Sequence, residues 1–439
     1  MKNYQSWGRY PKIDSNKQDV YHVYPDSFSF PESNEETTDA PLFLAYAQGR
    51  SYGDVCLNED GILLDTEHLD HFIQYDKENG ILRCEAGVTF DNILQLIIPH
   101  NWFLPVTPGT KYISIGGAIA NDVHGKNHHK AGTFGRYVLK FELLRSNGER
   151  LICSPTENTE LFNATIGGLG LTGLINWVEI SLKKIPGNRI EQETFRFNNL
   201  TEFYKLSDES DKDWEYTVAW IDCLAKGEEL GRGLFIRGNH CESKKKVKFK
   251  TAKLSVPFNA PGFLLNKYTV NAFNNLYYKR PLKQYSKVDF DPFFYPLDSI
   301  AHWNKLYGKK GFMQYQCVIP TEQRELAMNE MLSIISASGQ ASFLSVLKEF
   351  GDLKSPGLLS FPRKGTTLAL DFPNRGQKTL DLLNKLDVIT AKYNGAVYPA
   401  KDARMSPESF AQYYPKWKEF ESFIDPHFSS NFKRRISPK

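Results

Sequence analysis

One stretch of fourteen residues constrains the fold and function of this chain more than any other part of the sequence. It runs from Gly116 to His129 and reads GGAIANDVHGKNHH. It combines glycines and small side chains with three histidines, so it is too polar for a hydrophobic core and too specific for a linker. Glycine lets a backbone approach a flat ligand closely, and histidine can hydrogen-bond such a ligand near neutral pH. We therefore expect this stretch to lie against a flat ligand.

The length and charge of the chain limit the class of protein. With 439 residues the chain is too long for one small core, and two domains are expected. Hydrophobic residues make up 41% of the sequence and charged residues 24%, as in ordinary globular proteins. The formal net charge of +3 does not favour nucleic acid as a partner.

The cysteines and the N-terminal residues indicate the cellular compartment in which the protein is expected. The six cysteines are scattered, which fits neither a zinc site nor a disulfide framework, so we expect a reducing compartment. The first residues lack the apolar run of a secretory signal, and no apolar run approaches the ~18 residues that span a bilayer. The expected location is cytoplasmic, with peripheral contact at the inner membrane as the alternative.

The first part of the chain, to about residue 187, mixes predicted strands with predicted helices. Residues 61–65, 80–87 and 137–144 have the composition of strands, and Asn147-Gly148 is typical of a hairpin turn. Residues 90–98 have apolar spacings of three and four, which predict a helix. This pattern indicates an α+β domain rather than regular βαβ alternation.

The pattern of predicted elements changes after residue 187. Residues 188–394 carry longer predicted strands and aromatic clusters, and 322–338 and 376–393 are predicted helices. From about residue 395 the tail returns to a compact motif. We therefore predict a cofactor domain of residues 1–187 completed by 395–439, with a substrate domain of residues 188–394 inserted between them.

Two glycine-containing loops are candidate cofactor contacts. Residues 48–54 read QGRSYGD, and backbone N–H groups in such a turn can form an anion-binding nest for a pyrophosphate. A plain tight turn explains that loop about equally well. Residues 107–110 read TPGT and lead into Gly116, where an isoalloxazine or adenine ring could lie. Close packing of two backbone segments is the alternative there.

The three histidines of the opening stretch also suggest a metal site. His124 and His128 are four residues apart, but the neighbouring glycines make a helix across them doubtful and no HExxH motif is present. We therefore expect no metal. His124 is expected beside the cofactor ring, where it binds a substrate hydroxyl or phosphate. His128 and His129 are expected to be structural.

Residues 168–173 read GLGLTG and match the dinucleotide fingerprint letter by letter. That fingerprint follows a strand and opens a helix. Here residues 160–166 are helix-like and residues 174–182 are strand-like, so the order is inverted. We therefore expect no Rossmann NAD site, although the loop can still contact a cofactor.

Two groups of basic residues remain. Lys401, in AKDAR, could act as a base or stabilise charge that develops on a reduced ring, and a surface ion pair is the alternative. Lysines between Lys244 and Lys253 precede an apolar run that extends to Tyr278. Such a surface favours anionic lipid headgroups or a polyprenyl phosphate, although an ordinary solvated loop explains it equally well.

Taken together, these motifs resemble the decaprenylphosphoryl-β-D-ribose 2-oxidase family of vanillyl-alcohol-oxidase (PCMH-type) flavoproteins. The resemblance continues through FFYPLD at 293–298, GFMQYQ at 311–316, VLKEFG at 346–351 and LSFP at 359–362. It covers nearly the whole chain. It implies an α+β, two-domain PCMH-type fold, with FAD bound by the first segment plus the tail and an inserted substrate domain built on an antiparallel sheet.

The resemblance also implies roles for individual residues. A first group would hold the cofactor: Gly49, Arg50, Ser51, Tyr52, Gly53, Asp54, Gly109, Ser114, Ile115, Gly116, Gly117, Asn121, Asp122, Val123, His124, Ile175 and Tyr398. A second group would bind the substrate: Tyr52, Gln314, Gln316, Lys348, Phe350 and Lys401. Lys401 and His124 would be catalytic. Many relatives bind flavin covalently through a histidine near the first loop; here that neighbourhood reads Arg50-Ser51-Tyr52, which implies noncovalent FAD.

The implied reaction is oxidation of the 2′-hydroxyl of a lipid-linked ribose, a polyprenyl-phosphoryl sugar, to a 2′-ketone. A partner keto-reductase of the short-chain type would complete epimerisation to arabinose for the cell envelope. Peripheral membrane contact is expected through residues 244–278. The alternative function is a flavin oxidase or dehydrogenase of a soluble sugar, alditol or aldonolactone.

The sequence departs from the family pattern at two positions. Ala369 stands where actinobacterial members have the cysteine that reacts with mechanism-based inhibitors. Thr367 stands in place of an asparagine. The first departure argues against that covalent inhibition, and the second puts individual substrate contacts in doubt.

Overall fold

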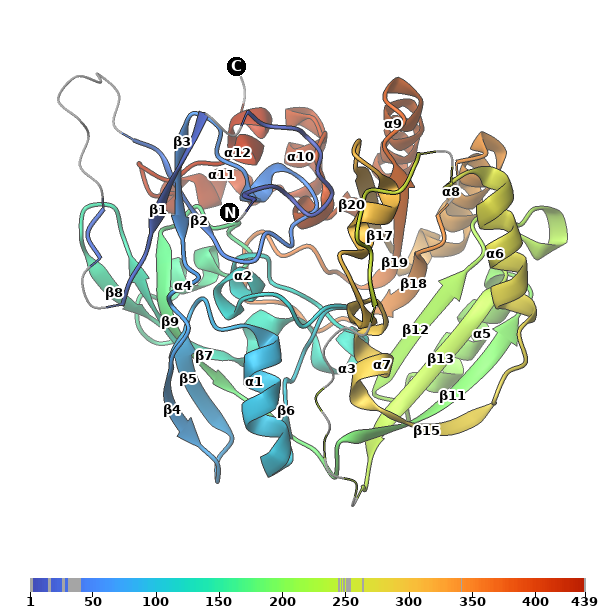
Figure 1. Cartoon of the computed structure of the whole chain (residues 1–439), viewed down its shortest axis with the longest axis horizontal. Coiled ribbons are helices and arrows are strands. Elements are labelled where there is room, and N and C mark those ends of the chain that lie inside the picture. The colour runs from blue at the N-terminus through green and yellow to red at the C-terminus, as the bar shows by residue number, and fades with distance from the viewer. Residues whose placement is uncertain are drawn as a thin grey trace.

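The computed structural model describes residues 3–14, 17–25, 28–30, 41–243, 245, 247, 249, 254–262, 264–340 and 342–437. Three larger sheets and their helices form the molecule (Figure 1). Two of these sheets belong to the N-terminal part of the chain, which ends near Gly187, and the third comes from the middle of the chain with one short strand from the tail. This arrangement is α+β, as the sequence predicts.

The N-terminal part contains a three-stranded parallel sheet and a five-stranded antiparallel sheet. The parallel sheet has the order β1 (Gln18–His22), β3 (Gly61–Asp65) and β2 (Phe43–Tyr46). The antiparallel sheet has the order β4 (Phe72–Asp76), β5 (Ile81–Glu85), β9 (Leu174–Ser181), β7 (Val138–Leu144) and β8 (Arg150–Cys153). The associated helices are α1 (Phe90–Ile97), α2 (Ile115–Ala120), α3 (His128–Ala131) and α4 (Thr159–Thr165).

An eight-stranded antiparallel sheet dominates the middle of the chain. Its order is β15 (Tyr285–Asp289), β11 (Arg189–Phe197), β13 (Gly233–Cys241), β12 (Tyr216–Ile221), β18 (Ser345–Phe350), β19 (Gly365–Pro373), β17 (Phe312–Pro320) and β20 (Ala396–Val397).

The two faces of this sheet have different surroundings, because successive side chains of a strand point to opposite faces. Side chains such as Phe235, Leu347 and Leu368 pack in the core with helices α5 (Leu200–Ser210), α8 (Arg324–Ser338) and α9 (Gln377–Lys392). The alternate side chains, among them Val346 and Lys348, line a cavity. One face of the sheet therefore packs in the hydrophobic core, and the other face lines the cavity.

Short strand pairs and further helices complete the fold. Strand β6 (Trp102–Phe103) pairs with β10 (Lys183–Lys184), and β14 (Leu254–Ser255) pairs with β16 (Ile300–Ala301). Helices α6 (Lys267–Lys279) and α7 (Phe290–Phe294) lie between β13 and β17 in sequence. The tail forms α10 (Pro407–Tyr413), α11 (Trp417–Phe420) and α12 (Asn431–Ile436). Within the described residues, no helix has the length and hydrophobicity needed to cross a bilayer.

Most predicted elements are confirmed. Strands β3, β5 and β7, helix α1 and the β7–β8 hairpin lie where the sequence predicts them. Helix α8 ends at Gly339, whose φ of 64° is the left-handed conformation that glycine adopts at such ends. The division into domains stays a prediction. Strand β20 crosses the predicted boundary between the two domains. Although β20 lies beyond residue 395, it pairs with β17 of the large sheet.

Two helices differ from the expectation. Helix α2 forms across Gly116 and Gly117, where glycines favoured a loop, because Ser114 caps it and accepts a hydrogen bond from the Gly117 N–H at 3.2 Å. Helix α6 forms inside the apolar run that was not predicted to be helical, and Asn266 caps it in the same way. Most of the lysine-rich residues 244–253 lie outside the described residues.

Candidate active site

A cavity of about 920 Å³ lies between the loops of the N-terminal part and the open face of the large sheet. Its lining comes from the whole length of the chain: residues within 44–56, 107–126 and 169–175 on one side, strands β12, β13, β17, β18 and β19 on the other, and Tyr398, Ala400 and Lys401 from the tail. A volume of this size lies at the upper end of the range for small-molecule and cofactor sites.

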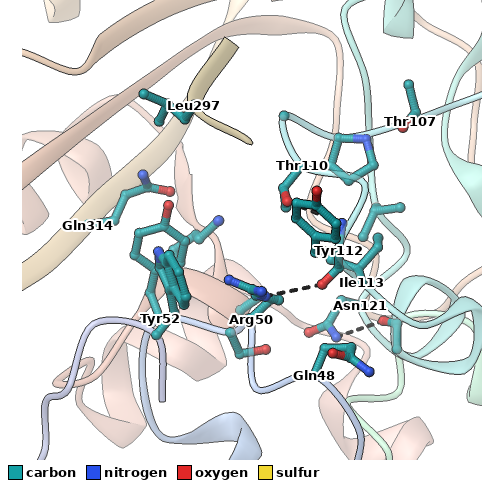
Figure 2. Close-up of a pocket in the computed structure, with 18 of the residues that line it drawn as sticks. Gln48, Arg50, Tyr52, Thr107, Thr110, Tyr112, Ile113, Asn121, Leu297 and Gln314 are labelled. Atoms are coloured by element: carbon teal, nitrogen blue, oxygen red, sulfur yellow. Dashed lines mark hydrogen bonds between the residues drawn. The ribbon is translucent and has the colours of Figure 1, made fainter. Parts of the chain in front are cut away.

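The loop from Gln48 to Tyr52 forms one end of the cavity (Figure 2). Gly49 has a φ of +57°, which favours glycine, and an added Cβ would lie 2.0 Å from the Tyr46 hydroxyl. In the described part of the chain, no hydrogen bond is made by the amide N–H groups of Gly49, Arg50 and Ser51, whereas that of Tyr52 donates to a carbonyl of the tail at 2.9 Å. The loop therefore offers donors to an anion, and its role as a pyrophosphate nest stays a prediction.

The Arg50 side chain is held beside this loop. Its Nε donates to the carbonyl oxygen of Tyr112 at 3.1 Å, which Figure 2 shows as a dashed line. The guanidinium carbon also lies 4.2 Å from the centroid of the Trp7 ring. These contacts join three segments that are distant in sequence.

The opening stretch of the sequence lines the next part of the cavity. An added Cβ on Gly116 would lie 3.0 Å from the Ala86 side chain, so backbone and neighbour approach closely. Asn121 Nδ2 donates to the Gly117 carbonyl at 2.8 Å, and the Tyr398 hydroxyl donates to the Asn121 carbonyl at 2.8 Å. The Oδ1 atom of Asn121 is buried and has no partner in the described part of the chain. It is an acceptor available to a ligand.

The GLGLTG loop has the inverted context that the sequence predicts. Helix α4 precedes it and strand β9 follows it. Three of its residues, Leu169, Gly170 and Gly173, line the cavity, so the loop contributes to the site without forming a Rossmann fingerprint.

His124 lies buried in an aromatic cage within the cavity wall. Its ring is 4.9 Å from that of Phe350, 5.8 Å from that of Phe361 and 5.4 Å from that of Tyr398. Gln316 Nε2 lies 3.0 Å from His124 Nε2 and can donate to it, while Nδ1 has no partner among the described residues. Burial and nearby lysine charges hold the pKa of His124 well below its usual value, so the ring is neutral. A neutral His124 ring can accept and donate hydrogen bonds.

Lys401 lies at the other side of this wall. Its Nζ is 3.7 Å from the centroid of the Tyr52 ring. Gln314 Nε2 donates to Asp371 Oδ1 at 2.5 Å, and the buried Oδ2 of Asp371 has no partner in the described part of the chain. Burial lowers the pKa of Lys401 and raises that of Asp371, although each charge favours the ionised form of the other. The site thus holds a lysine that can exchange a proton near neutral pH.

Two more lysines face the cavity. Burial, with the charges of Lys126 and Lys401, lowers the pKa of Lys348 to about 7. Burial lowers the pKa of Lys126 to about 8, and its Nζ donates to the Phe294 carbonyl at 3.0 Å. Asp298, a carboxylate of the lining, already accepts from the Lys111 N–H at 2.9 Å. An anionic ligand would stabilise the charged forms of Lys126, Lys348 and Lys401.

Most of the predicted site residues lie in the cavity lining, and five do not. Gly53, Asp54, Ile115, Asp122 and Phe350 have other surroundings. Asp54 binds Arg435 at 2.8 Å, and the N–H of Gly135 donates to Asp122 at 2.9 Å. Ile115 is buried in the core, Phe350 packs on His124, and an added Cβ on Gly53 would collide with the Asp402 carbonyl. These five support the loops that line the cavity.

Two residues of the site were not selected from the sequence. Lys126 lies inside the HGKNHH motif, so its place beside the histidines was an available signal. Asp371 carries no local signal, because it is brought opposite Gln314 only through the pairing of β17 with β19. His128 and His129 do not join His124 at a common point: His128 packs on Phe350, and His129 Nε2 hydrogen-bonds the Trp214 carbonyl at 3.0 Å.

Comparisons with known proteins give the family. Residues 38–154 match the model of an FAD binding domain. The chain is 35% identical over 413 residues to the decaprenylphosphoryl-β-D-ribose oxidase of Mycolicibacterium smegmatis, covering 90% of this chain and 88% of that protein. The chain belongs to the decaprenylphosphoryl-β-D-ribose oxidase family. It is therefore an FAD-dependent oxidoreductase of the PCMH type that acts on CH–OH groups, as the sequence resemblance implies.

More distant relatives match smaller parts of the chain. The human Δ(24)-sterol reductase is 30% identical over 122 residues, which cover 28% of this chain and 23% of that protein. The bovine L-gulonolactone oxidase is 26% identical over 201 residues, which cover 44% and 42% respectively. These partial matches contrast with the family match, which extends over both large parts of the chain.

The cavity lining fits FAD in this family. The open amide groups from Gly49 to Ser51 suit a pyrophosphate, and the glycines of α2 allow a flat ring to approach the backbone. The unpartnered Asn121 Oδ1 and His124 Nδ1 are polar atoms that a ring with donors and acceptors can satisfy.

Proposed function

We propose that this protein oxidises the 2′-hydroxyl of a polyprenyl-phosphoryl ribose to the 2′-ketone. The observation that carries the proposal is the convergence of Lys401, His124 and Lys348 on the wall of a cavity that also fits FAD. Lys401 and His124 provide a proton acceptor and a hydrogen-bonding ring. Lys348 and Lys126 provide cations for the phosphate that follows the sugar.

The proposal assigns a role to each part of the chain. Residues 1–187, completed by 395–439, form the FAD-binding domain, and residues 188–394 form the substrate-binding domain. The residues carried over from the family keep the cofactor and substrate roles that the sequence implies for them. The five that lie outside the lining act by positioning the loops.

Lys401 is the residue that handles the proton. FAD, when bound, supplies the acceptor for the hydride that leaves C2′ as the carbonyl forms. Lys401 Nζ accepts the proton of the 2′-hydroxyl, which its lowered pKa allows near neutral pH. The Tyr52 ring beneath Nζ stabilises the ammonium that results.

His124 and Gln316 orient the sugar. His124 is neutral, and its Nδ1 has no partner in the described part of the chain, so it can hydrogen-bond a sugar hydroxyl. The Gln316 side chain contacts His124 Nε2 at 3.0 Å and Thr367 Oγ1 at 3.3 Å, which fixes both partners. His124 and Gln316 are both buried, so this part of the wall is shielded from solvent.

The attachment of FAD is part of the proposal: we infer that it is noncovalent. The loop from Gln48 to Tyr52 contains neither histidine nor cysteine. Cys56 lines the cavity, but burial raises the pKa of its thiol to about 12, so it is protonated and a poor nucleophile. Acid precipitation should leave the yellow colour in the supernatant, and a coloured pellet would contradict this assignment.

The ketone product needs a further enzyme. A keto-reductase of the short-chain type that delivers hydride to the opposite face would convert ribose to arabinose for cell-envelope polysaccharide. A lipid-linked substrate also places the protein at the surface of the inner membrane, on the cytoplasmic side that its six free cysteines fit.

Anaerobic reduction of the purified holoenzyme tests the function. A short-chain prenyl-phosphoryl ribose should bleach the visible absorbance of the flavin, and the Lys401→Met variant should bind FAD without bleaching. Free pentoses, alditols and L-gulonolactone serve as competing donors. Bleaching by a soluble sugar or lactone, with none by the lipid-linked sugar, would establish the alternative function instead.

A further inference from the structure

Exposed apolar side chains gather in one region of the chain. Among the described residues, thirteen large hydrophobic side chains are exposed, and seven of them lie between Leu254 and Tyr285. Leu254 belongs to β14, and Phe258 follows it. Strand β14 pairs with the cavity-lining residues Ile300 and Ala301 of β16. Scattered exposed leucines need no explanation, but such a concentration indicates a surface that another molecule covers.

Helix α6 presents much of this surface. Its inner face includes Val270, Asn274 and Tyr278, and Asn274 Nδ2 donates to the buried Asp222 at 2.8 Å. Its outer face carries Tyr268, 73% exposed, and Leu276, 75% exposed. An ordinary surface helix turns its apolar side inward, whereas α6 combines a polar anchor with an apolar outer face.

The charges around α6 have one sign. Residues 254–288 contain five lysines and arginines and no aspartate or glutamate. Lys279, Arg280 and Lys283 follow one another at the C-terminal end of the helix, and all three are exposed. A basic rim around an apolar face favours an anionic lipid surface.

The cavity extends beneath the same helix. Phe273 and Tyr277 of α6 line it together with Trp220 and Phe343 from the large sheet side. The rings of Tyr277 and Trp220 are 4.7 Å apart, and those of Phe273 and Phe343 are 6.1 Å apart. Because Phe273 both lines the cavity and is 44% exposed, the cavity reaches the surface at α6.

This part of the cavity leads inward to the lysines. Val346 and Lys348 alternate with buried Leu347 on β18, so they face the cavity together. A ligand that lies along this wall meets aromatic and aliphatic side chains near α6, with Arg280 over the Tyr277 ring there, and lysines farther in. A prenyl chain followed by a phosphate has this order of chemistry.

We propose that α6 rests on an anionic membrane with Tyr268 and Leu276 in the lipid, and that the prenyl chain enters the cavity beneath the helix. The protein then takes its substrate directly from the bilayer surface. The identity of the entering chain rests on the proposed function, whereas the membrane contact of α6 stands on the exposed face and its charges.

Vesicle binding by the FAD-loaded protein tests this inference separately from catalysis. The wild-type protein should float with vesicles of phosphatidylcholine and phosphatidylglycerol and bind pure phosphatidylcholine weakly, with binding lost at high salt. Leu276→Asp should weaken binding about tenfold, because one leucine leaves the lipid and an acidic group enters it. Leu326→Asp is the matched control, since Leu326 is 68% exposed on α8.

The outcomes separate the possible occupants of this surface. Equal binding by the wild type and both variants, or no preference for anionic vesicles, would overturn the proposal. A dimer in solution that Leu276→Asp dissociates would show that a second copy covers α6 and would equally overturn it. Bleaching of the flavin by a short-chain substrate in detergent should be the same in Leu276→Asp and wild type, so a failure of the oxidation itself remains distinct.

Discussion

Lys401 differs from a surface lysine in its surroundings rather than in its sequence. Its ammonium lies over an aromatic ring, near a carboxylate whose own pKa burial raises. Substituting Lys401 with alanine removes the proton acceptor, and we expect kcat to fall about a thousandfold while FAD stays bound. Steady-state turnover with an artificial acceptor and the flavin absorbance of the purified variant provide the two measurements. Lys418→Ala, on the exposed side of the tail, is the control, and retained turnover in Lys401→Ala would refute the assigned role.

Lys348 should control the pH dependence of substrate capture. A lysine is protonated below its pKa, and the pKa of Lys348 is lowered to about 7. Its positive charge, and therefore its attraction for a phosphate, is lost as the pH rises through that value. We expect kcat/KM to decline on the alkaline side while kcat changes little, because a bound phosphate keeps Lys348 protonated. Lys348→Met should raise KM and remove this alkaline decline; an unchanged profile in the variant would assign the titration to another group.

Ala369 should make the protein insensitive to covalent inhibition of the kind that reacts with a cysteine at this position in actinobacterial relatives. It lines the cavity and is paired with Gln316 on β17 and Val346 on β18. A cysteine introduced by Ala369→Cys would face the same space. Intact-mass analysis after turnover with such an inhibitor should show an adduct on the variant and none on the wild type. An adduct on the wild type would show that another nucleophile reaches the inhibitor.

At the scale of single elements, helix α12 ties the tail to the first cofactor loop. Arg435 binds both oxygens of Asp54 at 2.8 Å and contacts Asp402, the residue after Lys401, at 2.9 Å. Removing the guanidinium leaves two buried carboxylates without their cation. Arg435→Ala should therefore lower the free energy of unfolding by about 3 kcal/mol and loosen the loop that carries Lys401.

Urea unfolding and FAD retention during gel filtration check this expectation. Lys433→Ala, on the same helix, is the matched control and should change the unfolding free energy by less than about 0.5 kcal/mol. Equal stability of the two variants would show that the Asp54 and Asp402 contacts contribute little.

Local sequence predicts an element well when one periodic pattern decides it. The apolar spacing of α1, the strand-like composition of β7 and the terminal glycine of α8 are of this kind. Helix α2 was not foreseen because glycine lowers helix propensity, while the Ser114 cap and packing against Ala86 decide the outcome. Helix α6 was not foreseen because apolar side chains occur on both of its faces: Val270 is buried, whereas Leu276 is exposed.

At the scale of the whole molecule, the site joins residues that no local pattern connects. His124 and Gln316 are 192 positions apart in sequence and 3.0 Å apart in space. Most of the residues that the family resemblance selected line the cavity, because a motif keeps its place in a fold. It did not select Asp371 or the apolar part beneath α6, because those depend on strand pairing and on which helix covers the sheet.

Because the site is built from segments that are distant in sequence, bound FAD should stabilise the folded structure. FAD would contact loops of the N-terminal part and Tyr398 of the tail, so it binds the native state and not the unfolded chain. A ligand at a thousandfold excess over its dissociation constant stabilises by about 4 kcal/mol. We therefore expect removal of FAD to lower Tm by at least about 5 °C, and added FAD to restore it. Calorimetry of the apo and reconstituted protein measures this shift. FMN, which lacks the adenylate half, is the control: full restoration by FMN would show that the loops around Gly49 and Gly170 do not hold the far end of the cofactor.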